Sequence, residues 1–445
     1  MNKIIATLIL SSASVFNYAY AQSTSESKVW TLEECIKHAV ENNISIRKAE
    51  LGIKQSKISL HTSKWAFSPN LNTNVGQSFS WGRSASPADN SYKDINNANT
   101  NFGVSASMPI FTGLQLETQL SIAKLNLQES IEQLNAAKED IAINVTSAYY
   151  NAMFNKEQYE LMLHQEELSK QQAEKMRTMF EAGKVAKPEV ANIEARLAQD
   201  KYNTVRAESQ YKNSILELAQ LLELASPESI LLSKEGLDSS KEITEQNIDE
   251  VYTNTVINRA TVKAESIKLE STKKNIKMAQ SQLFPQIYLS GGLGTSYYTL
   301  NGTALTPFST QLKNNLNKYI GINLGFNIFD RFSTKNRIRT AKLQHTFQAL
   351  QLEEVKKRMY KEVQQAWYEM TSAKEKLETS KTAVESAQLA LELTTEKLNL
   401  GKSTVIEYNE AKNNLTKMQS EHLQAKYNYM FRKRVLKFYQ GLNKE

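Results

Sequence analysis

Residues 320–329 read IGINLGFNIF, and this stretch decides the fold. Apolar side chains occupy every second position, and glycine or asparagine fills each position between them. Such alternation over about ten residues predicts a β-strand with one apolar face and one polar face. We therefore expect a strand that is about as long as a bilayer is thick.

A very different pattern follows this strand. From residue 330 to Gly401 the chain contains no proline, and apolar residues recur every seven positions: Val363, Met370, Leu377, Val384, Leu391 and Leu398. Sustained heptads favour coiled-coil packing. At about 1.5 Å per residue, a helix of this length is on the order of 100 Å long. Such a helix exceeds the dimensions of a compact domain.

The same order of patterns occurs earlier in the chain. Alternating stretches at residues 71–82 and 101–110 precede a proline-free run that stops at Gly183. The interval from Phe111 to Phe329 equals the interval from Gly183 to Gly401. This constant spacing predicts an internal duplication, with one structural repeat at residues 22–222, an equatorial connector at 223–247 and a second repeat at 248–445.

The alternating stretches allow two interpretations. One is a soluble sheet whose apolar face covers a core, and the other is a transmembrane barrel with apolar side chains toward lipid and small polar ones toward a lumen. The strand lengths, the nearly uncharged polar faces and the aromatic residues near the loop ends (Trp81, Tyr297 and Tyr298) favour the barrel. Because four strands cannot close a barrel, and unpaired edges are not tolerated in lipid, the chain must oligomerise.

Composition narrows the possible functions. Residues 1–21 resemble a signal peptide, with Lys3, an apolar stretch and the small-residue site Ala19-Tyr20-Ala21. The single cysteine, Cys35, rules out an internal disulfide framework. A net charge of +7 is scattered along the predicted helices, which argues against nucleic acid as a partner. The five histidines lack metal-ligand spacing, and no nucleophile with a base is apparent, so we expect no metal, no cofactor and no enzyme activity.

Several segments resemble TolC-type outer-membrane efflux channels. They are the opening from Trp30 to Asn43, the motifs Pro69-Asn70-Leu71 and Pro285-Gln286-Ile287, and the phenylalanine-containing strand ends before each long helix. The resemblance implies an α+β membrane protein in which four strands per chain contribute to a shared, trimeric, twelve-stranded outer-membrane barrel. That barrel would be continuous with a coiled-coil periplasmic tunnel. The implied partners are two further copies, the lipid bilayer, a periplasmic adaptor and an inner-membrane transporter.

The same resemblance directs attention to two predicted helix-to-helix turns. In the family these turns close the tunnel and meet the adaptor. Here the candidate docking residues are Gly183, Lys184, Val185, Glu189, Gly401, Lys402, Ser403 and Thr404. Glu407 and Glu410 are three residues apart and therefore share a helical face. They match the acidic positions that ring the closed aperture in the family, although acids in a first helical turn also favour the helix dipole.

One residue departs from the family pattern. Ser403 stands where some members carry a basic residue that helps to bridge neighbouring hairpins, so other contacts would have to hold the tips together. We expect a passive, gated exit duct of a tripartite efflux or type I secretion complex. The alternative is a periplasmic coiled-coil adaptor or scaffold without a pore.

Overall fold

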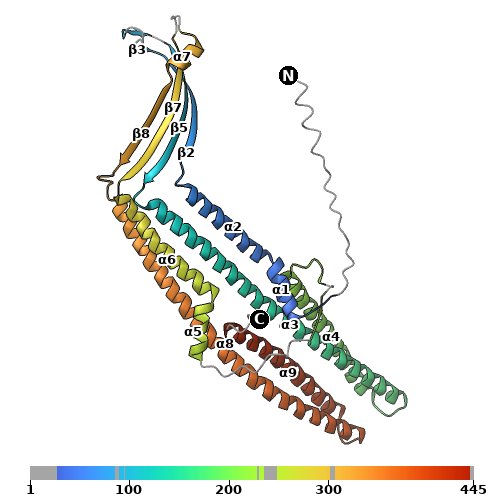
Figure 1. Ribbon diagram of the computed structural model, residues 1–445. Helices are drawn as coiled ribbons and strands as arrows, with labels where there is room; N and C mark the ends of the chain where they lie inside the picture. The colour runs from blue at the N-terminus through green and yellow to red at the C-terminus, as the bar shows by residue number, and fades with distance from the viewer. Residues whose placement is uncertain are drawn as a thin grey trace, which may run out of the picture.

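The computed structural model describes residues 28–85, 90–94, 96–227, 230–234, 248–300 and 306–440. A curved sheet at one end continues into a body of long helices (Figure 1). The predicted signal peptide, residues 1–21, lies outside the described residues, as do residues 235–247 of the predicted connector.

The sheet contains four antiparallel strands in the order β2 (Asn70–Ser80), β5 (Asn97–Phe111), β7 (Gln286–Leu300) and β8 (Asn317–Gly325). The pairing of β5 with β7 joins the two predicted repeats, and β2 and β8 form the two outer edges. Beyond the far ends of these strands lie the short hairpin β3 (Arg83–Ala85) and β4 (Tyr92–Asp94) and the short helix α7 (Phe308–Asn314).

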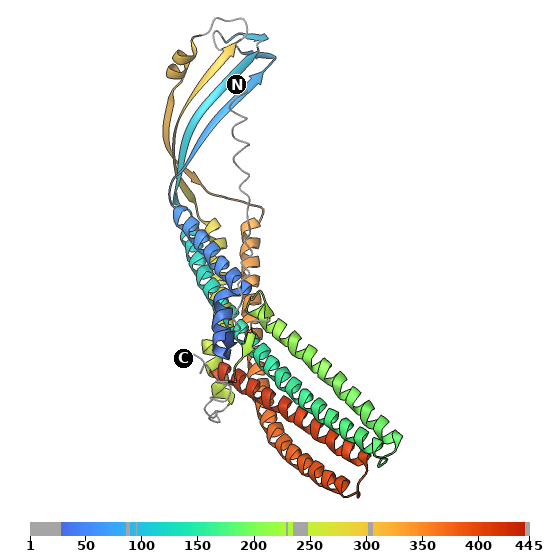
Figure 2. The ribbon, with the colours of Figure 1, turned by 90° about the vertical axis from the view of Figure 1, so that its right-hand side faces the viewer.

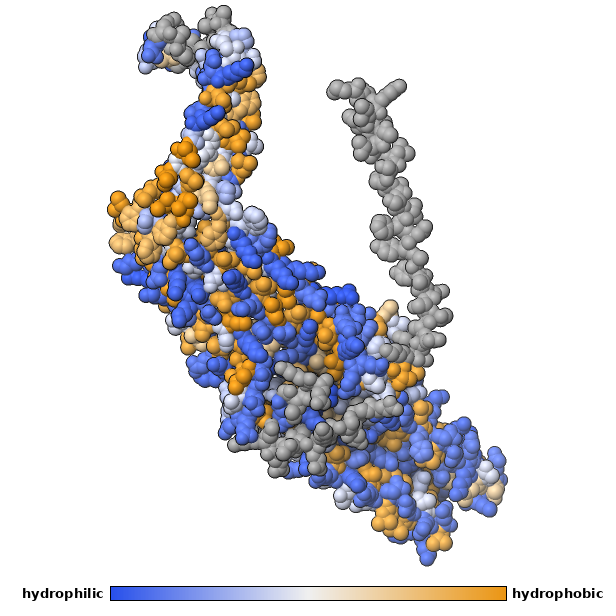
Figure 3. Space-filling model, viewed as in Figure 1, coloured by the Kyte–Doolittle hydropathy of each residue, from blue (hydrophilic) through white to orange (hydrophobic). Residues whose placement is uncertain are grey.

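The strand register puts the apolar residues of all four strands on one face. Leu71 pairs with Ala106, which pairs with Gly291, which in turn pairs with Ile320. Since paired residues point to the same side of a sheet, this row and those two residues away share one face. Neighbouring rows place Asn72 with Ser105 and Gly292 on the opposite face. The apolar face is uncovered within the chain, as the 81% exposure of Ile320 shows, and apolar side chains cover much of the sheet in Figure 3.

Two helices of 67 residues dominate the body, α3 (Gln115–Glu181) and α8 (Ser333–Asn399), each about 100 Å long. Shorter helices lie along each: α1 (Leu32–Asn42), α2 (Ile44–Trp65) and α4 (Lys187–Leu221) beside α3, and α5 (Ile248–Asn258), α6 (Ala260–Gln280) and α9 (Val405–Gln440) beside α8. The turns α3–α4 and α8–α9 lie at the same end, opposite the sheet (Figure 2).

The helical patterns from Thr31 to about Lys64 and from Ile248 to about Leu283 predict a single helix before each strand pair. Both predicted helices are broken, because Asn43 and Arg259 adopt extended backbone and divide them into α1–α2 and α5–α6. Asn43 stabilises its break, because its side-chain oxygen accepts a hydrogen bond from Ser45 N at 2.8 Å and its amide donates to Leu221 O at 3.1 Å. The motif Thr31-Leu32-Glu33-Glu34 predicts a capping box, and Thr31 and Glu34 form it at the start of α1.

Equivalent elements follow the spacing seen in the sequence. The interval from the start of α3 to the start of α8 equals the interval between their ends, and it is the same interval that separates Gly183 from Gly401. Leu114 and Phe332 directly precede these two helices; both have positive φ, at 66° and 62°, and make the corner between strand and helix. The two halves therefore share an order of elements and the geometry of their main corner.

A core of strand and helix residues lies about halfway along the helical body. The strand β1 (Lys28–Trp30) pairs in parallel with β6 (Ile230–Leu232), which belongs to the predicted connector. The fully buried Tyr149 of α3 lies below this pair, with its hydroxyl 2.9 Å from Trp30 O and 2.7 Å from Ser233 O. Burial raises the pKa of Tyr149, so its hydroxyl remains a donor. These contacts connect the start of the chain, the connector and the middle of α3.

Among the described helices, none has a segment that is both apolar enough and long enough to cross a membrane.

Candidate functional site at the helical tips

Both tip turns use the same backbone motif. Gly183 and Gly401 have φ of 71° and 72°, a left-handed conformation that strains other residues. After α3, Lys184 N donates to Met179 O at 2.8 Å; after α8, Lys402 N donates to Lys397 O at 2.8 Å. These bonds end each long helix in a Schellman motif. Each turn thus presents a lysine directly after its glycine.

The helices that leave the two turns begin differently. Thr404 caps α9: its hydroxyl accepts from Glu407 N at 3.2 Å, and Glu407 Oε2 accepts from Thr404 N at 3.1 Å. The Ser403 hydroxyl donates to the same carboxylate oxygen. The helix α4 instead has Pro188 in its first turn, and Ala186 at its N-cap provides no side-chain hydrogen bond. Side-chain hydrogen bonds therefore stabilise the start of α9. The start of α4 has no side-chain cap and instead carries a proline in its first turn.

The two candidate aperture residues, Glu407 and Glu410, differ in their contacts, because only Glu407 takes part in the capping box. Hydrogen bonds from Ser403 and Thr404 lower the pKa of Glu407, so its carboxylate stays ionised at neutral pH and points back into its own turn. Glu410 is exposed, and it has no hydrogen bond or ion pair within the described part of the chain. The structure thus gives Glu407 a local stabilising role and leaves Glu410 available to face another molecule.

A small apolar cluster joins the two turns. Ala173, Met176 and Ile193 are its buried members, and Val185 from the first turn and Val405 from the second pack against them. Val185 is half-buried, so this docking candidate also holds the tips together. Lys184, Glu189, Lys402 and Thr404 are exposed, and Ser403 is half-buried beside Glu407.

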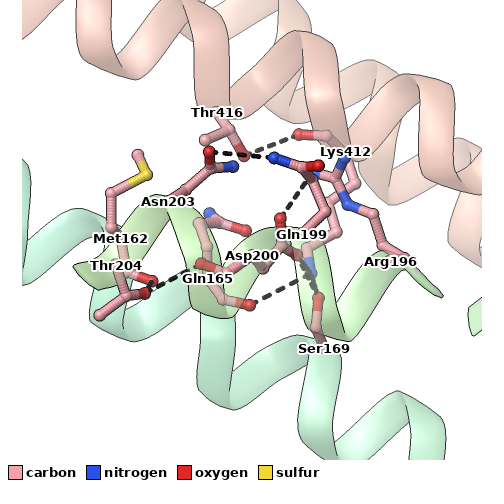
Figure 4. A network of polar contacts seen from close by, with 10 residues as sticks. All are labelled: Met162, Gln165, Ser169, Arg196, Gln199, Asp200, Asn203, Thr204, Lys412 and Thr416. Atoms are coloured by element: carbon pink, nitrogen blue, oxygen red, sulfur yellow. Dashed lines mark hydrogen bonds and ion pairs between the residues drawn. The ribbon is translucent and has the colours of Figure 1, made fainter. Parts of the chain in front are cut away.

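Above the tips, a buried polar network connects three helices (Figure 4). Lys412 of α9 is only 4% exposed, and its ammonium donates to Ser169 Oγ of α3 at 2.7 Å and to Gln165 O at 3.3 Å. The nearest acid is Asp200 of α4, with Oδ2 3.8 Å from Lys412 Nζ. Ser169 donates to that same oxygen at 2.5 Å, and Arg196 pairs with Oδ1 at 2.9 Å.

Two effects on the pKa of Lys412 oppose each other. Burial lowers the pKa of Lys412, whereas the charge of Asp200 opposes that shift. Because a charge is costly to bury without a partner, the carboxylate of Asp200 supports the buried ammonium through which Lys412 contacts the α3–α4 hairpin. The network therefore couples the two hairpins whose turns form the tips.

Sequence reasoning did not single out Lys412 or Asp200, although a signal was present. Lys412 lies four residues after Tyr408 and three before the buried Leu415. Asp200 lies seven residues after the buried Ile193 and four before the buried Thr204. Both charged residues thus occupy buried helical faces at helical spacing. A charge on such a face predicts a partner, but the sequence alone does not say on which helix.

The aromatic residues predicted at a membrane interface divide between the two faces of the sheet. Tyr297 pairs with Thr100 and lies on the apolar face, whereas Tyr298 pairs with Asn99 and lies on the polar face. Successive side chains of a strand point to opposite sides, so the two cannot belong to one outer girdle. Trp81 follows the end of β2, is exposed and stacks on Phe79 at 6.2 Å between ring centroids.

The described residues contain no group of three or more His, Cys, Asp or Glu side chains placed to hold a metal ion. Two histidines have hydroxyl partners instead: Thr272 lies 3.0 Å from His345 Nδ1, and Ser380 lies 2.9 Å from His422 Nδ1.

Residues 35–223 and 251–441 match the family described as "Outer membrane efflux protein". The chain belongs to the outer membrane efflux protein family. The two matched segments correspond to the two halves that carry the repeated order of elements.

Individual relatives of this efflux protein are distant in sequence. It is 20% identical to the outer membrane efflux protein BepC of Brucella suis over 96% of this chain and 87% of BepC. It is also 20% identical to the outer membrane protein TolC of Escherichia coli K12, over 77% of this chain and 70% of TolC. A solved membrane protein from Pseudomonas aeruginosa has a TM-score of 0.80 at 16% identity, with 92% of both chains covered.

These likenesses confirm the TolC-type resemblance and the helix-rich fold with a smaller sheet. The chain is therefore an outer-membrane efflux channel protein with a large periplasmic extension.

Proposed function

We propose that three copies of this efflux protein form a passive exit duct for a tripartite efflux or type I secretion complex, gated at its periplasmic tips. The sheet carries the proposal. It is curved, exposes one apolar face and leaves the edge strands β2 and β8 without partners in the described chain. Unpaired strand edges are not tolerated in lipid, so β2 of one copy would pair with β8 of the next.

In this arrangement three copies would close a twelve-stranded barrel above a continuous helical tunnel. The small and polar residues on the inner face, such as Asn72 and Ser105, would line the lumen. The repeated order of elements would place each half of a chain at an equivalent position in the wall. The adaptor and the inner-membrane transporter would meet the exposed tip residues, including Lys184 and Lys402.

The gate is proposed at the second tip turn. Three copies would bring six carboxylates, from Glu407 and Glu410, around a narrow opening and favour cations by focusing the field. Glu407 would add its negative charge to the field while its carboxylate caps α9. Glu410, which has no partner within the described residues, would contribute the more accessible charge.

Conductance across a planar bilayer tests the gate. We expect low conductance with a preference for cations, and loss of that preference in the double variant Glu407→Gln with Glu410→Gln. Glutamine can replace glutamate in a capping box, so the turn should keep its shape. The matched control is Glu181→Gln with Glu189→Gln at the first turn, which should retain the preference. Unchanged selectivity in the first variant, or equal loss in both, would remove these two glutamates from the aperture.

The alternative of a soluble periplasmic adaptor or scaffold is not supported. Such a protein would need something to cover the apolar face of the sheet, yet Ile320, Ile322 and Leu324 are all exposed. The match to an outer-membrane family over both halves points the same way. Cell fractionation separates the two interpretations, because an adaptor would be recovered in the soluble periplasm.

A further inference from the structure

Basic residues outnumber acidic ones where the strands meet the helices. The joints comprise residues 56–69, 112–124, 271–285 and 326–342, which connect β2, β5, β7 and β8 to α2, α3, α6 and α8. They contain two acids, Glu117 and Asp330, against eleven basic residues: Lys57, Lys64, Lys124, Lys273, Lys274, Lys277, Arg331, Lys335, Arg337, Arg339 and Lys342. We call these eleven residues the basic collar.

The opposite end of the same helices is balanced. Residues 172–196 and 390–414, which surround the two tip turns, contain eight acids and eight basic residues. The excess of positive charge at the sheet end of the helical body is therefore absent from the tip end.

The collar charges also lack acidic partners. Ten of the eleven side chains are exposed and Lys274 is half-buried. Within the described ranges no ion pair involves any of them, although ion pairs recur elsewhere along the helices, such as Arg432 with Glu369 at 2.5 Å. One of the two acids at the joints is already engaged, because Asp330 caps α8 by accepting from Thr334 N at 2.7 Å. The collar thus presents a band of uncompensated positive charge.

Exposed apolar rings accompany this charge. Trp65, Phe284, Phe329 and Phe332 lie within the same joints and are each more than half exposed. Aromatic side chains at the level of lipid headgroups mark the boundary of a membrane. Figure 3 shows the same change, from apolar side chains at the lower end of the sheet to hydrophilic ones where the helices begin.

We propose that the basic collar binds the anionic headgroups of phospholipids in the leaflet that faces the periplasm. The inference rests on the proposed barrel, in which the sheet would span the bilayer and its helical end would lie at that leaflet. The aromatic rings would then put the collar at headgroup depth. The phosphate of a phospholipid is an anion that would pair with the basic side chains of the collar. The acyl chains of the lipid would lie along the exposed apolar face of the sheet. This inference uses the outer-membrane location and does not depend on a gate at the tips.

The binding can be measured with the full-length protein in neutral detergent, using dansyl-labelled phosphatidylglycerol or phosphatidylcholine and energy transfer from tryptophan. Each basic residue near a lipid surface contributes roughly five-fold to binding of anionic lipid. We expect phosphatidylglycerol to bind at least ten-fold more tightly than phosphatidylcholine at low salt, with the preference declining as salt increases. Equal binding of the two lipids would overturn the proposal.

Variants locate the binding. Lys335→Gln, Arg339→Gln and Lys342→Gln together should reduce the affinity for phosphatidylglycerol by roughly 100-fold. The charge-preserving set Lys335→Arg, Arg339→Lys and Lys342→Arg should keep it. The matched control removes three exposed lysines far from the collar, Lys175, Lys201 and Lys374, and should also keep it.

Two results would contradict the inference. One is a collar variant that retains the lipid preference, or a control that loses it to the same extent. The other is displacement of the labelled phosphatidylglycerol by inorganic phosphate beyond the effect of sodium chloride at equal ionic strength, which would identify a free-phosphate site instead.

Discussion

The buried network around Lys412 makes an asymmetric prediction about the tips. Asp200 has two basic partners, Lys412 at 3.8 Å and Arg196 at 2.9 Å, whereas Lys412 has no other acid within ion-pair distance in the described chain. Replacing Asp200 by asparagine therefore leaves a buried ammonium without a counter-charge. Replacing Lys412 by methionine leaves Asp200 with Arg196 and with the hydroxyl of Ser169.

The expected magnitudes follow from these partners. Removing one member of a buried ion pair typically costs about 3–5 kcal/mol. Asp200→Asn should cost about 3 kcal/mol, at the lower end of this range, because Lys412 keeps its bonds to Ser169 Oγ and Gln165 O. Lys412→Met should cost only about 1–2 kcal/mol, since the remaining carboxylate is still paired and the methionine fills most of the space. The double variant should cost less than Asp200→Asn alone.

Hydrogen exchange read by mass spectrometry can report these energies locally, because exchange of a protected amide follows the free energy of local opening. For peptides covering residues 405–420 at the start of α9, about 3 kcal/mol corresponds to roughly 100-fold faster exchange. Lys412→Met should accelerate exchange roughly 5- to 30-fold.

The control is Lys417→Met on the same helix. Lys417 is exposed and only 3.9 Å from Glu421, so its loss should change exchange by less than about five-fold. Two results would contradict the proposed pairing of charges. One is that Lys412→Met accelerates exchange as much as Asp200→Asn does. The other is that the double variant exchanges faster than Asp200→Asn.

Two further predictions concern a turn and a histidine. Gly401→Ala should lower the melting temperature, since its φ of 72° costs an alanine about 1–2 kcal/mol, whereas Gly52→Ala inside α2, with free space around it, should raise it. A decrease for both would contradict this. Burial, with Lys426 and Lys381 nearby, lowers the pKa of His422 from 6.5. The unfolded chain therefore binds this proton first, and the urea midpoint should fall between about pH 7.5 and about pH 5.5. His422→Gln should reduce that fall, and an identical pH profile would exclude the histidine as its cause.

Much of the architecture could be predicted because it depends on local patterns. Alternation requires only that successive side chains point to opposite faces, and it correctly predicted a strand at residues 320–325. The same pattern at residues 326–329 was misleading, because β8 ends at Gly325. A seven-residue repeat without proline similarly favours a long helix whatever lies beside it. The limits of that reasoning appear at Asn43, where the break between α1 and α2 is stabilised by a bond to Leu221, 178 residues away.

At the tips, too, some features could be predicted from the sequence and others needed the tertiary structure. Glycines at the two turns follow from the need for a left-handed residue after each helix. The role of Glu407 needed coordinates, because an acid near a helix start can cap its own turn or face a neighbour. The structure shows the capping bonds with Thr404. Tyr297 and Tyr298 likewise could be assigned to opposite faces only once the register of β7 was known.

By itself, the sequence determined the types and order of the main elements, their repetition and the presence of one apolar strand face, since each depends on residues that are near in the chain. Only the tertiary structure decided which charges meet. Asp200 and Lys412 belong to different halves of the chain, and Gln158 of the first half likewise meets Ser420 of the second. A charge on a buried helical face has many potential partners along the chain, and packing of the helices selects one.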